Sequence, residues 1–323
     1  MSTTTTGNLT EFLPQWWDAR LAENLFPHLL LFNFGERRRV PRASGNSIKI
    51  PRPQRKNVVG AAPAQGTALL ASALSAQTVS GTMTKFAGAY EFSDLILMTG
   101  LSDSVEMAVR LLAKDLGREM DDHIRDQLSG SQAVEVDSGG ETTVGSASAN
   151  VFTGDIITQK TIARAVAELD AENNSRWPGS IYPAIIHPLQ QYDLFTNLSA
   201  NAWVQINQGS TDRALSMLYE GALGDLYGGR IWTSTNSVSK LNTGFSTVAS
   251  GYRSFMIAPQ AYFVTDVDSD LGTAETIVKP LGSAGSADPD NSLATVAAKV
   301  FFTAIPAAYG SENRLVRMYS SNV

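Results

Sequence analysis

The stretch from Ser102 to Gly130 constrains the fold more than any other part of the chain. Its apolar residues recur mostly at every fourth position, at Val105, Val109, Leu112, Leu116, Met120, Ile124 and Leu128. This spacing predicts one buried face of an α-helix and no strand. No proline interrupts the run, Asp103 with Glu106 (or Ser102) provides a start signal, and Gly130 provides a stop. The predicted helix, 103–128, is roughly 39 Å long, more than twice the average length. Alone, it also fits an ordinary helical bundle.

Composition limits the classes of protein that the chain can belong to. The 323 residues suffice for one large or two ordinary domains, and 43% of them are hydrophobic, which predicts a packed core. Cysteine is absent, which excludes disulfides, thiolate nucleophiles and cysteine-type zinc sites. The first residues, MSTTTTGNLTEF, do not resemble a signal peptide, and no apolar run is long enough to span a membrane. We expect a soluble protein made in a cytoplasm.

Charge is scarce and unevenly placed. Charged residues make up 17% of the chain, which suits a surface covered by neighbours. The segment from Glu36 to Lys56 carries a net charge of +7 in a chain of net −6, which leaves −13 elsewhere. Its basic residues are Arg37, Arg38, Arg39, Arg42, Lys49, Arg52, Arg55 and Lys56. This asymmetry predicts a basic arm or ribbon with an acidic partner surface, and we favour a contact between subunits.

Two segments before the long helix have little regular packing of their own. Residues 1–43 carry bulky apolar groups, among them Trp16, Trp17, Phe32 and Phe34. They fit either a core helix at the start of a domain or an arm that packs on another subunit. Residues 44–90 show strand-like alternation at each end of a stretch rich in Gly, Ala, Ser and Thr. They predict either two strands of an extended ribbon, which needs a surface to lie on, or disorder.

The remainder of the chain predicts a mixed α+β fold without the regular alternation of a parallel sheet. The expected helices are 155–173, 189–195 and 214–219, and the expected strands are 182–187, 230–235, 294–306 and 313–319. Residues 131–154 predict a flexible or hairpin insertion.

The order of these parts resembles the major capsid proteins of tailed phages with the Hong Kong-97-type fold, and is most similar to the family of phage N-four. The resemblance is carried by an apolar arm and extended ribbon, GAYEFSDL at 88–95, the long helix, the strand ending IIHP with the following QQYDLF, and LYEGALGDLYGGRIWTSTN at 218–236. It covers most of the chain.

The resemblance implies a flat subunit that assembles into hexamers and pentamers of an icosahedral head around double-stranded DNA. Its parts would be an N-terminal arm (1–43), an E-loop hairpin (44–88), a peripheral domain with the spine helix (89–155), an axial domain (156–260) and returning strands (261–323). The implied partners are other copies, a separate scaffolding protein, a portal protein, a possible decoration protein and, without sequence specificity, the packaged DNA. It further implies a place in the virion after assembly in a host cytoplasm, with no cofactor and no membrane.

No residue pattern predicts an enzyme. The chain lacks a phosphate-binding G-x-x-x-x-G-K-[ST], an H-E-x-x-H and a G-x-S-x-G motif. Glu119, His123 and Asp126 share a helical face, which we interpret as solvated and not as a metal site. His187 is interpreted as a structural hydrogen-bonding residue. The D-x-D-x-D run that starts at Asp266 lacks the glycine and glutamate that a calcium loop requires.

Two alternative functions remain. An encapsulin-like compartment shell would have the same fold and hold a cargo enzyme. A nucleic-acid-binding module would use residues 36–56, although that segment lacks the interleaved aromatic residues that stack on bases. Lysine–asparagine cross-links occur in some capsids of this fold, but no motif identifies Lys49, Lys56 or Lys85 as a cross-linking residue.

Overall fold

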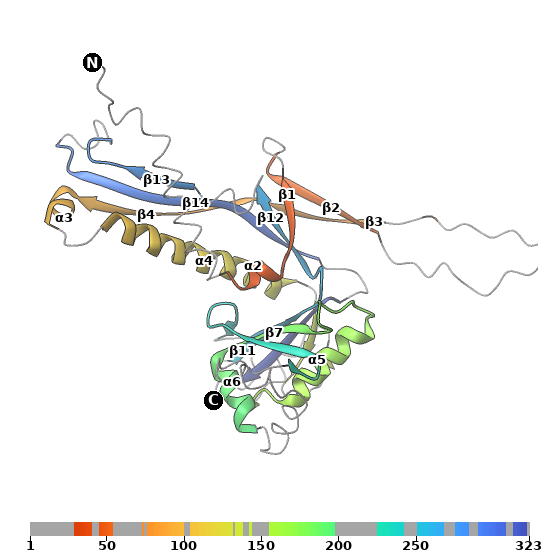
Figure 1. The fold of residues 1–323 in the computed structure, drawn as a ribbon. Helices are drawn as coiled ribbons and strands as arrows, with labels where there is room; N and C mark the ends of the chain where they lie inside the picture. Colours follow the sequence, from red (N-terminus) through yellow and green to blue (C-terminus); the bar gives the residue numbers. More distant parts are fainter. Residues whose placement is uncertain are drawn as a thin grey trace, which may run out of the picture.

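The structure is a computed structural model, and it describes residues 29–40, 45–53, 73, 76–99, 104–131, 133–137, 142–143, 155–197, 225–241, 251–267, 275–283, 290–307 and 313–321. Predictions for Trp16, Trp17, Arg42, Arg55 and Lys56 lie outside these residues. So do the predicted helix 214–219 and most of the insertion 131–154. Of Arg52, only the backbone is described. Figure 1 shows a long sheet with a helix along it, a hairpin that projects to one side, and a second body of sheet and helices.

The predicted long helix is helix α4, Ser104–Gly130. Six of its seven predicted apolar positions are at most 4% exposed, and Val105 is partly buried against the same core. Helix α4 packs lengthwise against two antiparallel strands, β4 (Thr84–Ser93) and β14 (Leu293–Pro306). The fourfold spacing therefore identified the buried face correctly.

Strands β4 and β14 belong to a five-stranded sheet. Its other strands are β1 (Glu36–Val40), β12 (Tyr262–Val267) and β13 (Glu275–Lys279). Strand β1 pairs in parallel with β12, and the other pairings are antiparallel. Inward positions of β14 alternate with partly exposed ones along its first nine residues, as expected of a strand with one face on a core. The short helix α3 (Asp94–Thr99) follows β4.

A second, eight-stranded sheet forms the other body. Its strands are β5 (Val134–Val136), β6 (Thr142–Thr143), β7 (Tyr182–Ile186), β8 (Asp225–Leu226), β9 (Gly229–Thr233), β10 (Ser239–Leu241), β11 (Gly251–Ile257) and β15 (Leu315–Ser321). Helices α5 (Gln159–Ala171) and α6 (Pro188–Asn197) belong to this body (Figure 1). It has its own core, which includes Tyr182, Met256 and Val316.

Local signals explain where the helices of the second body begin. Helix α5 starts at Gln159, four residues later than predicted, because Thr158 and Thr161 form a reciprocal capping box. Helix α6 starts on Pro188, which has no amide hydrogen to lose in the first turn. The Gln190 side chain then accepts a hydrogen bond from the His187 amide at 2.9 Å.

Two buried hydrogen bonds between side chains join strands β15 and β5 of the second sheet. Arg317 donates to Glu135 at 3.0 Å, and the Tyr319 hydroxyl donates to the same carboxylate oxygen at 2.9 Å. Both charged side chains are at most 9% exposed. Because a buried charge is costly unless it is paired, these bonds fix the register of β15 against β5.

Two further described elements lie outside both sheets: a segment that packs on α4 and a separate hairpin. The segment Leu29–Phe34, which contains the short helix α2 (Leu31–Phe34), packs on α4. Strand β2 (Ser47–Pro53) pairs with β3 (Ala76–Thr82) in an antiparallel hairpin, which confirms the predicted two-stranded ribbon. Within the described residues, no helix is both long and apolar enough to cross a membrane.

Adjacent leucines of α4 offer a direct test of its buried face. Leu112 is 3% exposed, whereas Leu111 is 45% exposed. We expect Leu112→Ala to lower the free energy of unfolding by about 2–5 kcal/mol, because it leaves a cavity in the core. The control Leu111→Ala should cost well below about 1 kcal/mol. Chemical denaturation of the unassembled protein measures both; equal losses would mean that the helix is packed differently.

Candidate assembly surfaces

The β2–β3 hairpin extends away from the sheet that supports its base (Figure 1). Within the described residues these two strands pair only with each other. Ile48, Ile50 and Val79 pack against Ile305 and nearby residues of the five-stranded sheet, and the described side chains beyond them are exposed or partly exposed. A two-stranded ribbon is marginal in water without support. The outer part of the hairpin is therefore a surface suited to contact with another molecule.

Gly81 permits the close approach at the base of the hairpin. A Cβ atom at this position would lie 2.4 Å from Cγ1 and 2.7 Å from Cδ1 of Ile305. Ile305 is only 1% exposed, so its side chain has little room to move. The glycine thus lets the hairpin backbone lie directly on the sheet, which sets the direction in which the hairpin leaves the body.

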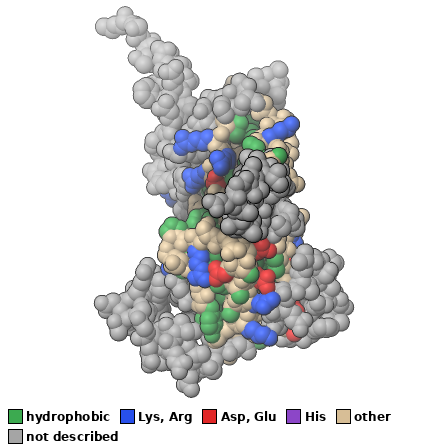
Figure 2. Space-filling view, turned by 90° about the vertical axis from the view of Figure 1, so that its right-hand side faces the viewer, with side chains coloured by type: hydrophobic (Ala, Val, Ile, Leu, Met, Phe, Trp, Pro, Cys, Tyr) green, Lys and Arg blue, Asp and Glu red, His purple; other side chains and the backbone are tan. Residues whose placement is uncertain are grey.

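A row of arginines occupies strand β1, at the edge of the described five-stranded sheet. Arg37, Arg38 and Arg39 are all exposed. Arg38 pairs with Glu36 at 2.6 Å, and the Arg37 guanidinium lies over the Phe32 ring at 5.1 Å. In Figure 2, Lys and Arg side chains gather on the upper part of the face shown, with little acidic surface beside them.

The structure corrects the interpretation of residues 36–56 as one basic ribbon. Arg37 to Arg39 lie on a strand of the body, whereas Lys49 is an exposed residue of the projecting hairpin. The difference arises because the valine that ends β1 is buried and the strand pairs along its whole length with β12, so it cannot leave the sheet. The arginine row and Lys49 therefore lie on different elements, β1 of the sheet and β2 of the hairpin.

Phe32 and Phe34, which were predicted to pack in the N-terminal arm, both contact their own chain. Phe32 is 1% exposed in the core beneath α4. The Phe34 ring meets Trp177 and Trp232 edge-on, with ring centroids 6.1 and 5.8 Å apart. The two aromatic residues thus connect the two bodies of one copy. Contact of the arm with other copies stays a prediction.

An exposed apolar patch that the sequence did not predict consists of Leu95, Ile96, Met98, Met107 and Leu111. These side chains of α3 and the start of α4 are 45–79% exposed. The apolar run LILM at 95–98 is the feature of the sequence that could have indicated this patch. Exposed apolar patches mark contact sites for other molecules, so this end of α4 is a third candidate surface.

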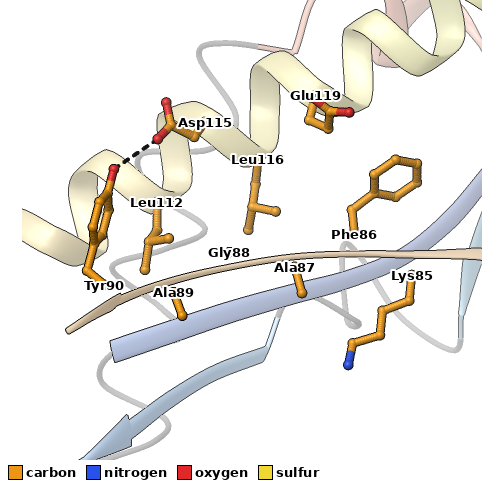
Figure 3. Close-up of a pocket in the computed structure, with 10 residues that line it drawn as sticks. All are labelled: Lys85, Phe86, Ala87, Gly88, Ala89, Tyr90, Leu112, Asp115, Leu116 and Glu119. Atoms are coloured by element: carbon orange, nitrogen blue, oxygen red, sulfur yellow. Dashed lines mark hydrogen bonds between the residues drawn. The ribbon is translucent and has the colours of Figure 1, made fainter. Parts of the chain in front are cut away.

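A groove of about 460 Å³ lies between β4 and α4 (Figure 3). Its floor is open because Gly88 has no side chain; an added Cβ would lie 3.1 Å from Leu112. At its rim the Tyr90 hydroxyl donates to Asp115 at 3.1 Å, which raises the pKa of this tyrosine. The groove holds no cluster of catalytic groups, and it extends the exposed surface along α4.

The histidines singled out by sequence have structural surroundings. The structure corrects the interpretation of His123 as part of a solvated face, because its ring packs between Phe86 and Phe302 at 5.2 and 5.3 Å. This burial lowers the pKa of His123 and favours the neutral ring. His187 accepts a hydrogen bond from the Leu189 amide at 3.2 Å, which confirms its predicted role. Among the described residues, no group of acidic and histidine side chains could hold a metal ion.

Comparison with known proteins identifies the fold. No protein-family model matches the sequence, and no curated protein sequence matches it. The capsid of Ralstonia phage GP4 aligns with a TM-score of 0.69 at 11% identity, over 90% of this chain and 87% of that chain. The cyanophage Pam1 capsid aligns with a TM-score of 0.65 at 13% identity, over 87% and 86%. A virus-like particle from Pyrococcus furiosus aligns with a TM-score of 0.52 at 11% identity, over 95% and 99%.

The chain therefore has the Hong Kong-97-type capsid fold, as the sequence predicted. The three structures described here are two phage capsids and a virus-like particle. The resemblance to the phage N-four family in particular stays a prediction, as do the boundaries of the arm, E-loop, peripheral and axial domains.

Gly81 allows a test of how the hairpin is seated. We expect Gly81→Val to separate the hairpin from the sheet, because the new side chain collides with buried Ile305. Hydrogen–deuterium exchange should then speed up in β2 and β3 of the unassembled chain. Ser80→Val is the matched control, since Ser80 is an exposed neighbour on the same strand. Unchanged exchange in Gly81→Val would show that the base is not seated as described.

Proposed function

We propose that the protein is the major capsid protein of a tailed phage. Copies would assemble into hexamers and pentamers of an icosahedral head that encloses double-stranded DNA. The observation that carries the proposal is the β2–β3 hairpin, whose strands, within the described residues, pair with each other and rest on the body only at their base. Together with a fold shared with phage capsids, this favours a subunit that is completed by its neighbours.

Each candidate surface has a role in this proposal. The hairpin and the part of the N-terminal arm before residue 29 would lie across adjacent copies, and helix α4 would stiffen the subunit. The basic residues, including Arg37, Arg38, Arg39 and Lys49, would face the acidic remainder of a neighbouring copy, with packaged DNA as a non-specific contact. A scaffolding protein, a portal protein and a possible decoration protein would be separate chains. Assembly would take place in the host cytoplasm.

A compartment shell that holds a cargo enzyme is the second candidate, because the fold also matches the virus-like particle from Pyrococcus furiosus. The TM-scores of the two phage capsids described above are higher than the score of that particle, which favours the phage head. The two functions differ in their contents. Packaged DNA in particles purified from an infected host supports the phage head, and a co-purifying enzyme supports the compartment.

Electron microscopy of the expressed protein, alone and with the scaffolding protein from the same genome, tests the proposal. We expect closed shells or isolated capsomers under at least one of these conditions. A uniform population of single copies under all conditions, with no rings or shells, would contradict it.

The arginine row gives a prediction about assembly. Arg37→Gln combined with Arg39→Gln should slow shell formation and weaken its salt dependence, because two cations that steer neighbouring copies are lost. Light scattering during assembly measures the rate at several salt concentrations. The charge-matched control, Lys160→Gln with Arg164→Gln, removes two cations from α5.

The same variants separate an assembly role from nucleic-acid binding. If the arginine row mediates contacts between copies, the Arg37/Arg39 variant should assemble more slowly while its DNA binding is less affected. If instead DNA binding in a salt titration disappears while assembly keeps its rate, the arginine row serves nucleic acid.

A further inference from the structure

Asp121 of α4 is a buried carboxylate that binds three backbone amides. The residue is 1% exposed. Its Oδ2 accepts hydrogen bonds from the amides of Leu30 and Leu31 at 2.8 and 3.3 Å, and its Oδ1 accepts from Phe32 at 3.3 Å. The Ser237 hydroxyl donates to Oδ2 at 3.2 Å. One side chain thus satisfies donors from two segments that are far apart in sequence.

These bonds meet where three parts of the chain come together. The amides belong to the segment Leu29–Phe34, and Ser237 belongs to the loop between β9 and β10 of the second sheet. The same loop is tied to α4 by two more bonds, from Arg125 to the Asn236 carbonyl and from the Asn236 side chain to the Arg118 carbonyl, both 2.9 Å long. We call this contact of segment, loop and helix the junction.

The surroundings of Asp121 make it sensitive to protonation. Burial raises its pKa to about 6 from an ordinary value of 3.8, and the amide and hydroxyl donors only partly oppose this effect. In the part of the chain that the structure describes, no cationic side chain pairs with it. Among the described residues, hydrogen bonds are therefore what stabilises its charge at neutral pH, in a site that penalises charge.

Few other groups at the junction can titrate. The segment 29–34 and the loop 234–238 contain no acidic or basic side chain. From β12, Tyr262 faces the site; its hydroxyl donates to the Leu31 carbonyl, and burial keeps its pKa well above the usual range. On α4 itself, Arg125 pairs with Asp122 and Asp126. On the same helix, burial also raises the pKa of Asp122 and lowers the pKa of His123. Among the described side chains that bond directly to the segment and the loop at Asp121, Asp121 is the one whose charge changes between pH 5 and 7.5.

We propose that Asp121 is a proton-controlled latch: the docked junction takes up a proton in mild acid and closes more tightly, and it loosens when the carboxylate is charged. The inference concerns a single copy and holds whether or not copies form shells.

The direction follows from linkage. If the segment leaves, water reaches the carboxylate and its pKa returns toward 3.8, so the docked state binds the proton more tightly than the released state. Acidification must then favour docking. Protonation removes the cost of burying a charge, and the remaining carbonyl oxygen still accepts amide hydrogen bonds. For this shift, the docking equilibrium should strengthen about tenfold between pH 7.5 and pH 5.

Hydrogen–deuterium exchange of the full-length, unassembled chain tests the latch. After correction for the intrinsic pH dependence of exchange, protection of the Leu30, Leu31 and Phe32 amides should rise about tenfold from pH 7.5 to pH 5. Asp121→Asn, a neutral carboxamide of the same shape, should abolish this pH response. Asp115→Asn is the control, because Asp115 is an exposed acid of the same helix and should leave the response unchanged.

A second variant keeps the test decisive if Asp121→Asn does not fold. The Ser237 hydroxyl stabilises the charged form of Asp121, so Ser237→Ala should move the midpoint of the pH response to higher pH. Protection that does not change with pH in the wild type would overturn the proposal. So would a pH response that persists in Asp121→Asn, or a midpoint that Ser237→Ala shifts to lower pH.

Discussion

The structure depends on how α4 holds the two sheets together. Apolar residues of the second sheet, among them Ile185, Phe255 and Ile257, lie in the same core cluster as α4, and the segment Leu29–Phe34 and a loop of the second sheet add hydrogen bonds to this contact. Because α4 is rigid over 27 residues, a contact near its middle transmits the position of one body to the other. The directional bonds of Asp121 set the geometry of this contact, and the ring of Phe34 between Trp177 and Trp232 fills the remaining space.

A second constraint is that the described chain leaves several apolar side chains and strand edges exposed to solvent. A chain of this size normally buries most of its apolar surface within itself. Here the hairpin and the patch at α3 and α4 leave apolar and backbone groups without cover from the described chain. Gly81 and Gly88 show that the backbone is shaped for close contacts where the hairpin and β4 meet the body. The low proportion of charged residues agrees with such a surface, since a neighbour that covers it need not desolvate many charges.

The sequence predicted those features that rest on local or periodic physics. The apolar spacing of α4, the proline start of α6 and the alternation of the hairpin strands each depend on residues close together in the chain. The separation of Arg37 to Arg39 from the hairpin was not predictable in this way, because it depends on pairing with β12, more than 200 residues away. Asp121 was missed for the same reason. Its partners, Leu30 and Ser237, lie 91 and 116 residues away in the sequence.

The junction lies beside an apolar contact between α4 and the second sheet, since Ile185, Phe255 and Ile257 share a core cluster with Leu128 of α4. A subunit that occupies rings of five and of six must tilt its parts slightly between the two environments. A tightly packed apolar interface resists such a change, because a shift of a fraction of an ångström already forfeits much of the contact energy. The hydrogen bonds at Asp121, 2.8 to 3.3 Å long, add direction to this apolar contact. In the proposed shell, the junction would therefore keep α4 and the second sheet in one arrangement in both environments.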